Sequence, residues 1–246
     1  MNNFTLKEAI LCTVCLAALI LTAPLAVGNA RNNAKLIGCV NKLRMIGAAE
    51  LTYAADNKSE LAMGEKNYIR DGGAARAATY SMGTPPMMLI RHKYLKTDNP
   101  ADSIAVKRER FFHCPEDEVN FVNSPITGWG KPVPAISYFY CWFATQKCLR
   151  NHSFPCKTRD DQDDNYGLRS NIDRDDPERF IFADLVKNTS RAWSGQPKEK
   201  ARANHNGCFN TLYIGGHVST KNINAKQEEW LLGGSHRFAL LADNVR

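Results

Sequence analysis

The stretch AILCTVCLAALILTAPLAV, from Ala9 to Val27, contains no charged residue and decides the shape expected for the chain. At about 1.5 Å per residue, a helix of these nineteen residues is about 28 Å long, close to the hydrocarbon thickness of a bilayer. The stretch therefore predicts a membrane-spanning helix. The alternative is a signal peptide cleaved after Ala30, but the apolar run exceeds the usual signal core of about 7–15 residues.

A second pattern follows the apolar stretch. Beyond Arg31, apolar residues recur at the three- and four-residue spacing of one helix face: Leu36, Val40, Leu43, Ile46, Ala49 and Tyr53. This stripe predicts that the helix continues to about Ala55, stops at Asp56-Asn57 and docks on the rest of the chain. We expect one long helix with a membrane half and an amphipathic half.

The net charge of +7 raises the question of a nucleic-acid partner. The densest basic groups are Lys107–Arg110 and Lys198–Arg202, and each contains a glutamate. Neither alternates basic with aromatic residues, and the sequence has no nucleic-acid-binding motif. We therefore expect these groups to form solvated surface and predict no nucleic-acid partner.

Eight cysteines constrain the body of the protein. Two of them lie in the apolar stretch, and the others are Cys39, Cys114, Cys141, Cys148, Cys156 and Cys208. An even number in a domain outside the cytoplasm permits up to three disulfides, whose pairing the spacing does not fix. Cys148 and Cys156 are close enough to close a local loop. A zinc site is the weaker alternative, because no C-x₂-C pair is followed by a second such pair downstream.

The N-terminus gives the first resemblance to a known family. Phe4-Thr5-Leu6-Lys7-Glu8, followed at once by an apolar helix, resembles the prepilin-type segment of type IV pilins and type II secretion pseudopilins. The resemblance implies that a prepilin peptidase cuts between Asn3 and Phe4 and methylates the new amine. It also implies that Glu8 pairs with the amine of a neighbouring subunit during assembly. Asn3 replaces the family's usual Gly, and Lys7 replaces an apolar residue.

A second resemblance covers the amphipathic half. The run from Cys39 to Gly47, with Tyr53 and Asp56-Asn57, is similar to the post-membrane segment of a pilin-like subfamily of Lentisphaerae and Planctomycetes-type bacteria. In that subfamily a Cys-Pro follows an aromatic strand, and here Cys114 follows Phe111-Phe112. On this resemblance we expect a Cys39–Cys114 disulfide that ties the head to the helix. Two buried free thiols are the alternative.

The remaining residues predict a head of short elements. Ile136–Phe143 is rich in aromatic residues and predicts a central strand, while Phe180–Asp184 and Phe209–Ile214 predict two more strands. A short helix is expected to open at Pro85. The fold class expected is α+β, with the long helix packed on a mainly antiparallel sheet.

The C-terminal motif links a histidine to a glycine pair. His205 and Gly215-Gly216-His217 resemble the subfamily's H-x₉-DG pattern, with Gly215 in place of Asp. Physically, the segment predicts a hairpin whose two-residue turn, Gly215-Gly216, needs positive φ. His205, His217 and Asp184 have side chains suited to catalysis or metal binding. Neither G-x-S-x-G nor H-E-x-x-H is present, so we expect structural hydrogen bonds and no enzymatic activity.

An acidic run lies in the segment 147–177, which is expected to be an insertion or long loop. Three of its residues fit the oxygen-ligand positions of an EF-hand: Asp161, Asp163 and Asn165. Tyr166 stands where that loop needs Gly, and Ile172 where it needs Glu. We favour a solvated loop over a loose calcium site, and expect no other cofactor.

These patterns divide the chain into a leader at 1–3, a transmembrane helix at 4–30, its amphipathic continuation at 31–57 and a head at 58–246. The resemblance implies a structural subunit of a pilin-like or type II secretion pseudopilus-like assembly. Its partners would be other pilin-like subunits, the prepilin peptidase and the membrane. It would cross the inner membrane once, with a periplasmic or extracellular head. A membrane-tethered surface or binding protein, and a secreted hydrolase starting at Arg31, are the alternatives.

Overall fold

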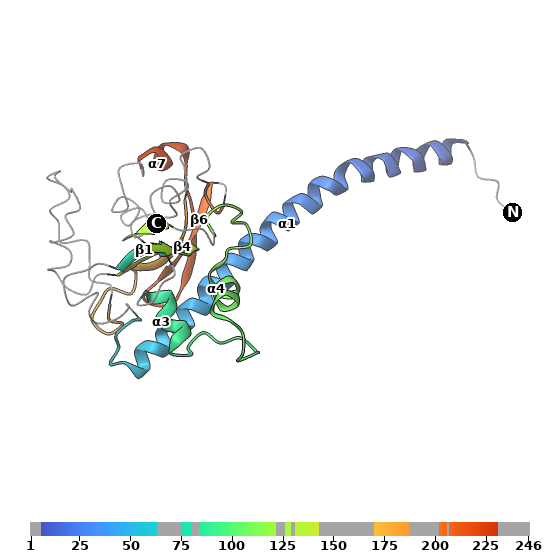
Figure 1. Ribbon diagram of the computed structural model, residues 1–246. Helices are drawn as coiled ribbons and strands as arrows, with labels where there is room; N and C mark the ends of the chain where they lie inside the picture. Colours follow the sequence, from blue (N-terminus) through green and yellow to red (C-terminus); the bar gives the residue numbers. More distant parts are fainter. Residues whose placement is uncertain are drawn as a thin grey trace.

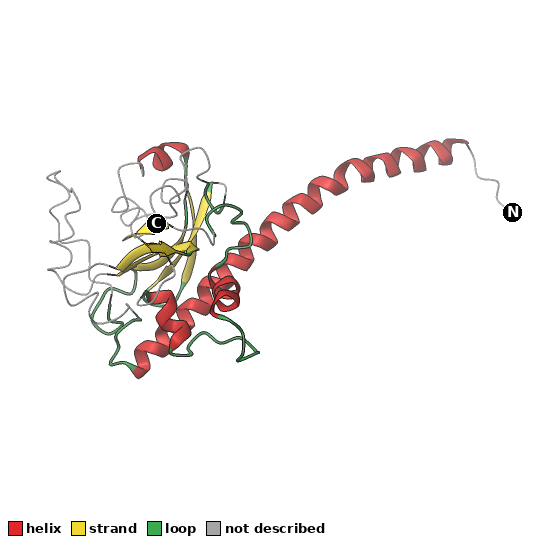
Figure 2. Cartoon of the chain, in the orientation of Figure 1, coloured by secondary structure: helices red, strands yellow, loops and turns green. Residues whose placement is uncertain are grey.

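The computed structural model shows an α+β chain in which helices accompany an antiparallel sheet, as the sequence predicts (Figures 1 and 2). It describes residues 6–62, 75–79, 84–121, 126–128, 131–142, 170–186, 202–205 and 207–230.

Helix α1 runs without interruption from Leu6 to Asp56. Its first half extends away from the head, and its second half lies against the sheet and helix α4 (Figure 1). Seven of its residues are buried there: Cys39, Leu43, Ile46, Gly47, Ala49, Glu50 and Ala54. The helix ends one residue beyond the predicted Ala55. Among the described residues, no helix has the length and apolar character of a membrane span.

The main sheet contains five strands in the order β1-β4-β5-β6-β7, and each neighbouring pair is antiparallel. Their bounds are Ala75–Thr79 for β1, Ala135–Trp142 for β4, Phe180–Asp184 for β5, Cys208–Tyr213 for β6 and Val218–Asn222 for β7. Strands β2 (Ile126–Gly128) and β3 (Lys131–Val133) form a separate ribbon. The short helices are α3 (Pro85–Arg91), α4 (Ile104–Phe112) and α7 (Ala225–Trp230).

The three predicted strands form the interior of the sheet as β4, β5 and β6. Every residue of β4 from Ala135 to Cys141 is buried, with β1 and β5 beside the strand in the sheet and α4 packed against it. Aromatic rings pack within the sheet, where Phe139 of β4 is stacked on Phe180 of β5 at 6.3 Å, and between the layers, where Phe112 of α4 is stacked on Phe182 of β5 at 6.5 Å. The core therefore lies between the sheet and the helices α1 and α4.

Helix α4 corrects two expectations. Phe111 and Phe112 end this helix rather than forming a strand. Ser103 caps its first turn by accepting a hydrogen bond from Val106 N, and the buried residues Arg108, Phe111 and Phe112 have helical spacing. The basic group Lys107–Arg110 is therefore not wholly solvated. The Arg108 side chain is buried, with its guanidinium 4.4 Å from the Phe121 ring.

The hairpin between β6 and β7 corrects a third expectation, the length of its turn. Its loop has three residues rather than two, because Tyr213 N donates to His217 O and Gly216 N donates to Tyr213 O. Only Gly216 of the predicted glycine pair has a positive φ, at +82°. A β-turn followed by one left-handed residue is the common three-residue hairpin loop. The turn therefore needs a positive φ at Gly216 only, and not at Gly215 as the sequence predicts.

Candidate functional site

The disulfide between Cys39 and Cys114 is present, which confirms the predicted pairing. Cys39 lies in α1, and Cys114 follows the end of α4 by two residues. Their Cα atoms are 5.2 Å apart, and both side chains are fully buried. The bond thus joins the middle of the long helix to the head.

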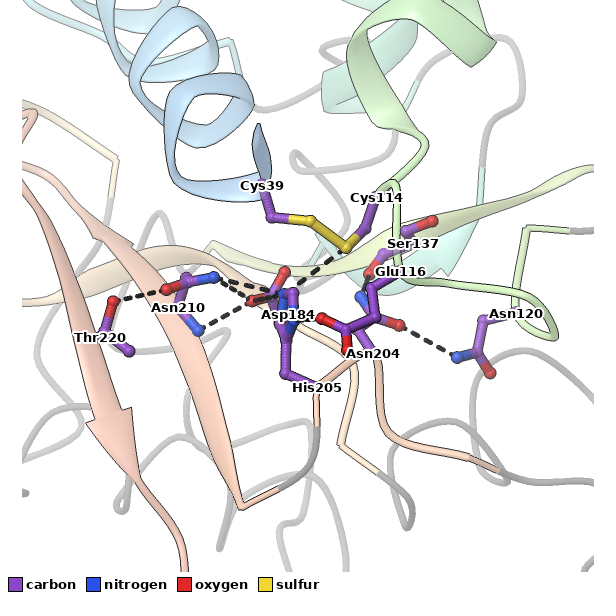
Figure 3. Close-up of polar contacts among 10 residues, drawn as sticks. All are labelled: Cys39, Cys114, Glu116, Asn120, Ser137, Asp184, Asn204, His205, Asn210 and Thr220. Carbon is purple, nitrogen blue, oxygen red and sulfur yellow. Dashed lines mark hydrogen bonds and ion pairs between the residues drawn. A yellow bond between two sulfur atoms is a disulfide. The ribbon is translucent and has the colours of Figure 1, made fainter. Parts of the chain in front are cut away.

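His205 lies directly beside this disulfide (Figure 3). Its Nε2 atom is 3.5 Å from Cys114 Sγ and 3.2 Å from Asp184 Oδ2. Its Nδ1 atom bonds to Glu116 Oε2 at 2.5 Å. The ring is therefore held between two carboxylates and a sulfur. We call Cys39, Cys114, Glu116, Asp184, His205 and Asn210 the His205 cluster.

Asp184, the last residue of β5, is fully buried within the cluster. Its Oδ2 accepts hydrogen bonds from Asn210 N at 2.8 Å and Asn210 Nδ2 at 2.7 Å. Asn210 is itself held by Thr220 Oγ1, which donates to its Oδ1 at 2.6 Å. No described residue bonds Asp184 Oδ1. Neighbouring strands β5, β6 and β7 thus position the carboxylate.

Asn204 fixes the backbone just before His205. Its Nδ2 donates to Ser137 O at 2.5 Å in β4, and its backbone N donates to Leu185 O at 2.8 Å. Its Oδ1 accepts from Asn120 Nδ2 at 3.1 Å. The imidazole position is therefore set by bonds from Asn204 to three other segments, two of which, through Ser137 and Asn120, can be followed in Figure 3.

Two pKa shifts describe the electrostatics of the cluster. Burial alone would lower the pKa of His205, but the hydrogen bonds and charges of Asp184 and Glu116 outweigh burial and raise it. Burial raises the pKa of the Cys208 thiol, and the same two carboxylates add to this effect. A thiol with a raised pKa is a poor nucleophile at neutral pH. While the Cys39–Cys114 disulfide is intact, the cluster is better suited to structural ion pairs of His205 with Asp184 and Glu116 than to nucleophilic chemistry.

The structure brings together only part of the histidine and aspartate set considered from the sequence. Asp184 and His205 meet, whereas His217 lies past the far end of β6. The His217 ring stacks on Tyr213 at 4.4 Å, and its Nε2 is 3.6 Å from Glu178 Oε2. His205 and Gly216 therefore lie beyond opposite ends of strand β6, and the C-terminal motif does not form one site.

Sequence reasoning missed two members of the cluster, Glu116 and Asn210. Glu116 lies 89 residues from His205 in the sequence, and Asn210 lies inside the buried strand β6. The signal for Asn210 was visible, because a buried strand from Phe209 to Ile214 contains polar residues only for a partner. Glu116, two residues after Cys114, carried no such signal.

Several predicted site residues lie outside the described residues. They are Asn3 and Phe4 of the processing site, Cys148 and Cys156 of the second disulfide, and Asp161, Asp163 and Asn165 of the calcium alternative. Glu8 belongs to α1, but its side chain is outside the described set.

Comparisons with known proteins give no assignment. No family model matches the chain, and no curated protein or solved structure matches it significantly.

Proposed function

We propose that this protein is a structural subunit of a pilin-like or type II secretion pseudopilus-like assembly. Residues 4–30 anchor it in the inner membrane before assembly, and its head lies on the periplasmic or extracellular side. The observation that carries the proposal is the segment Phe4–Glu8, which leads directly into the uncharged stretch Ala9–Val27. A new amine at Phe4 would be a cationic partner for the Glu8 carboxylate of a neighbouring subunit.

The long helix supports this role. Helix α1 starts at Leu6, and its first half stands clear of the head (Figure 1). Leu11 and Val14, on this half, are 64% and 60% exposed in the single chain. Apolar side chains on a projecting helix need an apolar environment, which a bilayer and neighbouring helices both supply. Under this proposal, the membrane surrounds the first half of α1 before assembly, and the helices of neighbouring subunits surround it afterwards.

The second half of the helix also suits a structural subunit. The Cys39–Cys114 disulfide fastens it to the head, and Leu43 and Ile46 are fully buried there. A covalent fastening preserves the orientation of the head on its helix during assembly. The ion pairs of His205 are enclosed rather than open to a substrate, since only 2% of its side chain is exposed.

Processing is tested by intact mass. The full chain is expressed with a prepilin peptidase, and in a matched host whose peptidase is inactive. We expect loss of residues 1–3 and one added methyl group on Phe4 only with the active enzyme. Asn3→Gly, which restores the family's usual residue, should be cut at least as efficiently. An uncut chain beside a cut Asn3→Gly control would contradict processing of this protein, and a start at Arg31 would indicate a signal peptide.

Assembly is tested by Glu8→Ala, with Glu118→Ala at an exposed position of the head as the matched control. We expect Glu8→Ala to remain in the membrane fraction but to lose cross-linked oligomers, because the buried amine would lack its carboxylate partner. Glu118→Ala should retain both. Oligomers that survive Glu8→Ala at the wild-type level would disprove the intersubunit role.

A further inference from the structure

The His205 cluster contains a complete set of metal-binding atoms. One ligand atom from each of Cys39, Cys114, Asp184 and His205 lies within 4.8 Å of the others, and all four residues are buried. Two sulfurs, one imidazole nitrogen and one carboxylate oxygen are donors that zinc accepts in tetrahedral sites. The two sulfurs are joined to each other as a disulfide, so they become available only after reduction.

The distances around His205 match such a site. With a Zn–S bond of about 2.3 Å and other bonds of about 2.0 Å, tetrahedral geometry separates S from N by about 3.5 Å and N from O by about 3.3 Å. Cys114 Sγ is 3.5 Å from His205 Nε2, which is 3.2 Å from Asp184 Oδ2. These two separations already match the tetrahedral values, and the four ligand atoms all lie within 4.8 Å of one another. After reduction, the two sulfurs have to separate to about 3.8 Å.

The residues around these atoms are also those of a metal site. Glu116 bonds Nδ1 of His205, which directs Nε2 toward Asp184 and the sulfurs. Metal-binding histidines commonly donate their second N–H to a carboxylate in this way. Asn210 holds one oxygen of Asp184, while the other oxygen has no partner among the described residues. A cation beside this buried carboxylate would also attract Oδ1, the oxygen that lacks a partner among the described residues.

We propose that reduction of the Cys39–Cys114 disulfide converts the His205 cluster into a tetrahedral Zn²⁺ site. The ligands are the two thiolates, Nε2 of His205 and a carboxylate oxygen of Asp184. The disulfide and the zinc ion are alternative cross-links between the same two segments, α1 and the residues that follow α4. This site is independent of any role in assembly.

The conversion balances with a dithiol as reductant. The dithiol gives two electrons and two protons to the disulfide and is itself oxidised to a disulfide, which leaves two thiols. Each thiol releases its proton as its sulfur binds zinc, and His205 releases the proton on Nε2. The zinc keeps its oxidation state throughout. A second disulfide can reverse the change: it takes two electrons from the two thiolates and two protons from water to become two thiols, the Cys39–Cys114 bond re-forms, and the ion is expelled.

Zinc content and cysteine protection test the proposal on the wild-type full chain in detergent. One sample stays oxidised, and the other is reduced with a phosphine, which takes oxygen from water to become a phosphine oxide. Each receives Zn²⁺ and then passes through gel filtration. We expect one zinc per chain after reduction and none before it. Mass spectrometry after alkylation should show that zinc protects Cys39 and Cys114 but not Cys208.

Cobalt(II) provides a spectroscopic test of the ligands. Tetrahedral cobalt bound by thiolates gives intense visible bands and a sulfur-to-metal charge-transfer band. We expect both in the reduced wild type and in Cys208→Ser, whose thiol is outside the ligand set. The charge-transfer band should disappear in the Cys39→Ser, Cys114→Ser double variant, and Asp184→Asn should weaken cobalt binding.

Two results would overturn the zinc site. The first is equal zinc retention by the oxidised and reduced chains. The second is alkylation of Cys39 and Cys114 at the same rate with and without zinc, including the case in which other cysteines are protected instead. Both comparisons use the wild-type chain, so they remain decisive even where a variant fails to fold.

Discussion

At the scale of a single residue, Glu50 is the least expected feature of the helix. It lies on the buried side of α1 with no exposed surface, and its Oε2 accepts a hydrogen bond from Ala62 N at 2.9 Å. Its Oε1 has no partner among the described residues. Burial raises the pKa of this carboxyl to about 8, although the Ala62 bond acts in the opposite direction. Glu50 is therefore protonated in the folded state at neutral pH.

This pKa predicts a pH-dependent stability. The carboxyl has an ordinary pKa of 4.5 and a folded value of about 8, so the folded state holds the proton more tightly. Stability is full below pH 4.5 and falls by about 1.4 kcal/mol per pH unit until the folded pKa is passed. Glu50→Gln cannot ionise and should remove this loss. As pH rises from 4.5 to about 8, we expect the free energy of unfolding of Glu50→Gln to increase relative to that of the wild type. Urea unfolding followed by tryptophan fluorescence measures this difference.

The exposed glutamate Glu118 supplies the control. Glu118→Gln should follow the wild-type pH dependence, because Glu118 is an exposed residue and the buried Glu50 stays in place. If Glu50→Gln and the wild type had parallel stability curves across the whole window, the carboxyl would not be buried as described.

At the scale of elements, the β6–β7 hairpin and α1 meet at two glycines. A Cβ atom on Gly216 would lie 2.6 Å from Leu51 Cδ1, and one on Gly47 would lie 2.7 Å from Leu212 Cδ1. Both distances are too short for packed carbons. The turn of the C-terminal motif is therefore a docking point for the helix, and Gly216 leaves room there for the Leu51 side chain.

Gly216→Ala should destabilise the protein by about 2 kcal/mol, from the left-handed backbone and the contact with Leu51 together. Gly207→Ala is the matched control, because Gly207 also has a positive φ, +69°, but no atom within 4 Å of the added Cβ. Thermal unfolding should show a larger loss at Gly216 than at Gly207. Leu51→Ala should recover part of the Gly216→Ala loss. Equal losses at the two glycines would refute the contact.

The elements also show what the sequence could and could not predict. Strands β4, β5 and β6 were predictable because each is an apolar run bounded by turn residues. Helix α4 was not, since Phe111 and Phe112 look the same at the end of a helix as in a strand. The His205 cluster was only partly predictable. Glu116 and His205 are 89 residues apart, and no local pattern shows that the fold joins them.

At the scale of the whole molecule, the disulfide closes a loop with a sequence separation of 75 residues. In the chain-entropy model, a loop of this length stabilises the folded state by roughly 4 kcal/mol. The Cys39→Ser, Cys114→Ser double variant should therefore unfold at a lower urea concentration by a corresponding amount. A reductant should shift the wild type in the same direction when a chelator is present, and leave the double variant unchanged. Insensitivity of the wild type to the reductant would contradict the role of the bond.

The position of this bond also determines how the molecule responds to tension. A pull on the N-terminal end of α1 reaches the covalent link at Cys39 before the helix residues from Val40 to Asp56. The force passes through a covalent bond to Cys114 and then into the head. The packed contacts of the last helical turns bear little of it. The helix can therefore be pulled from its exposed end without being peeled off the sheet.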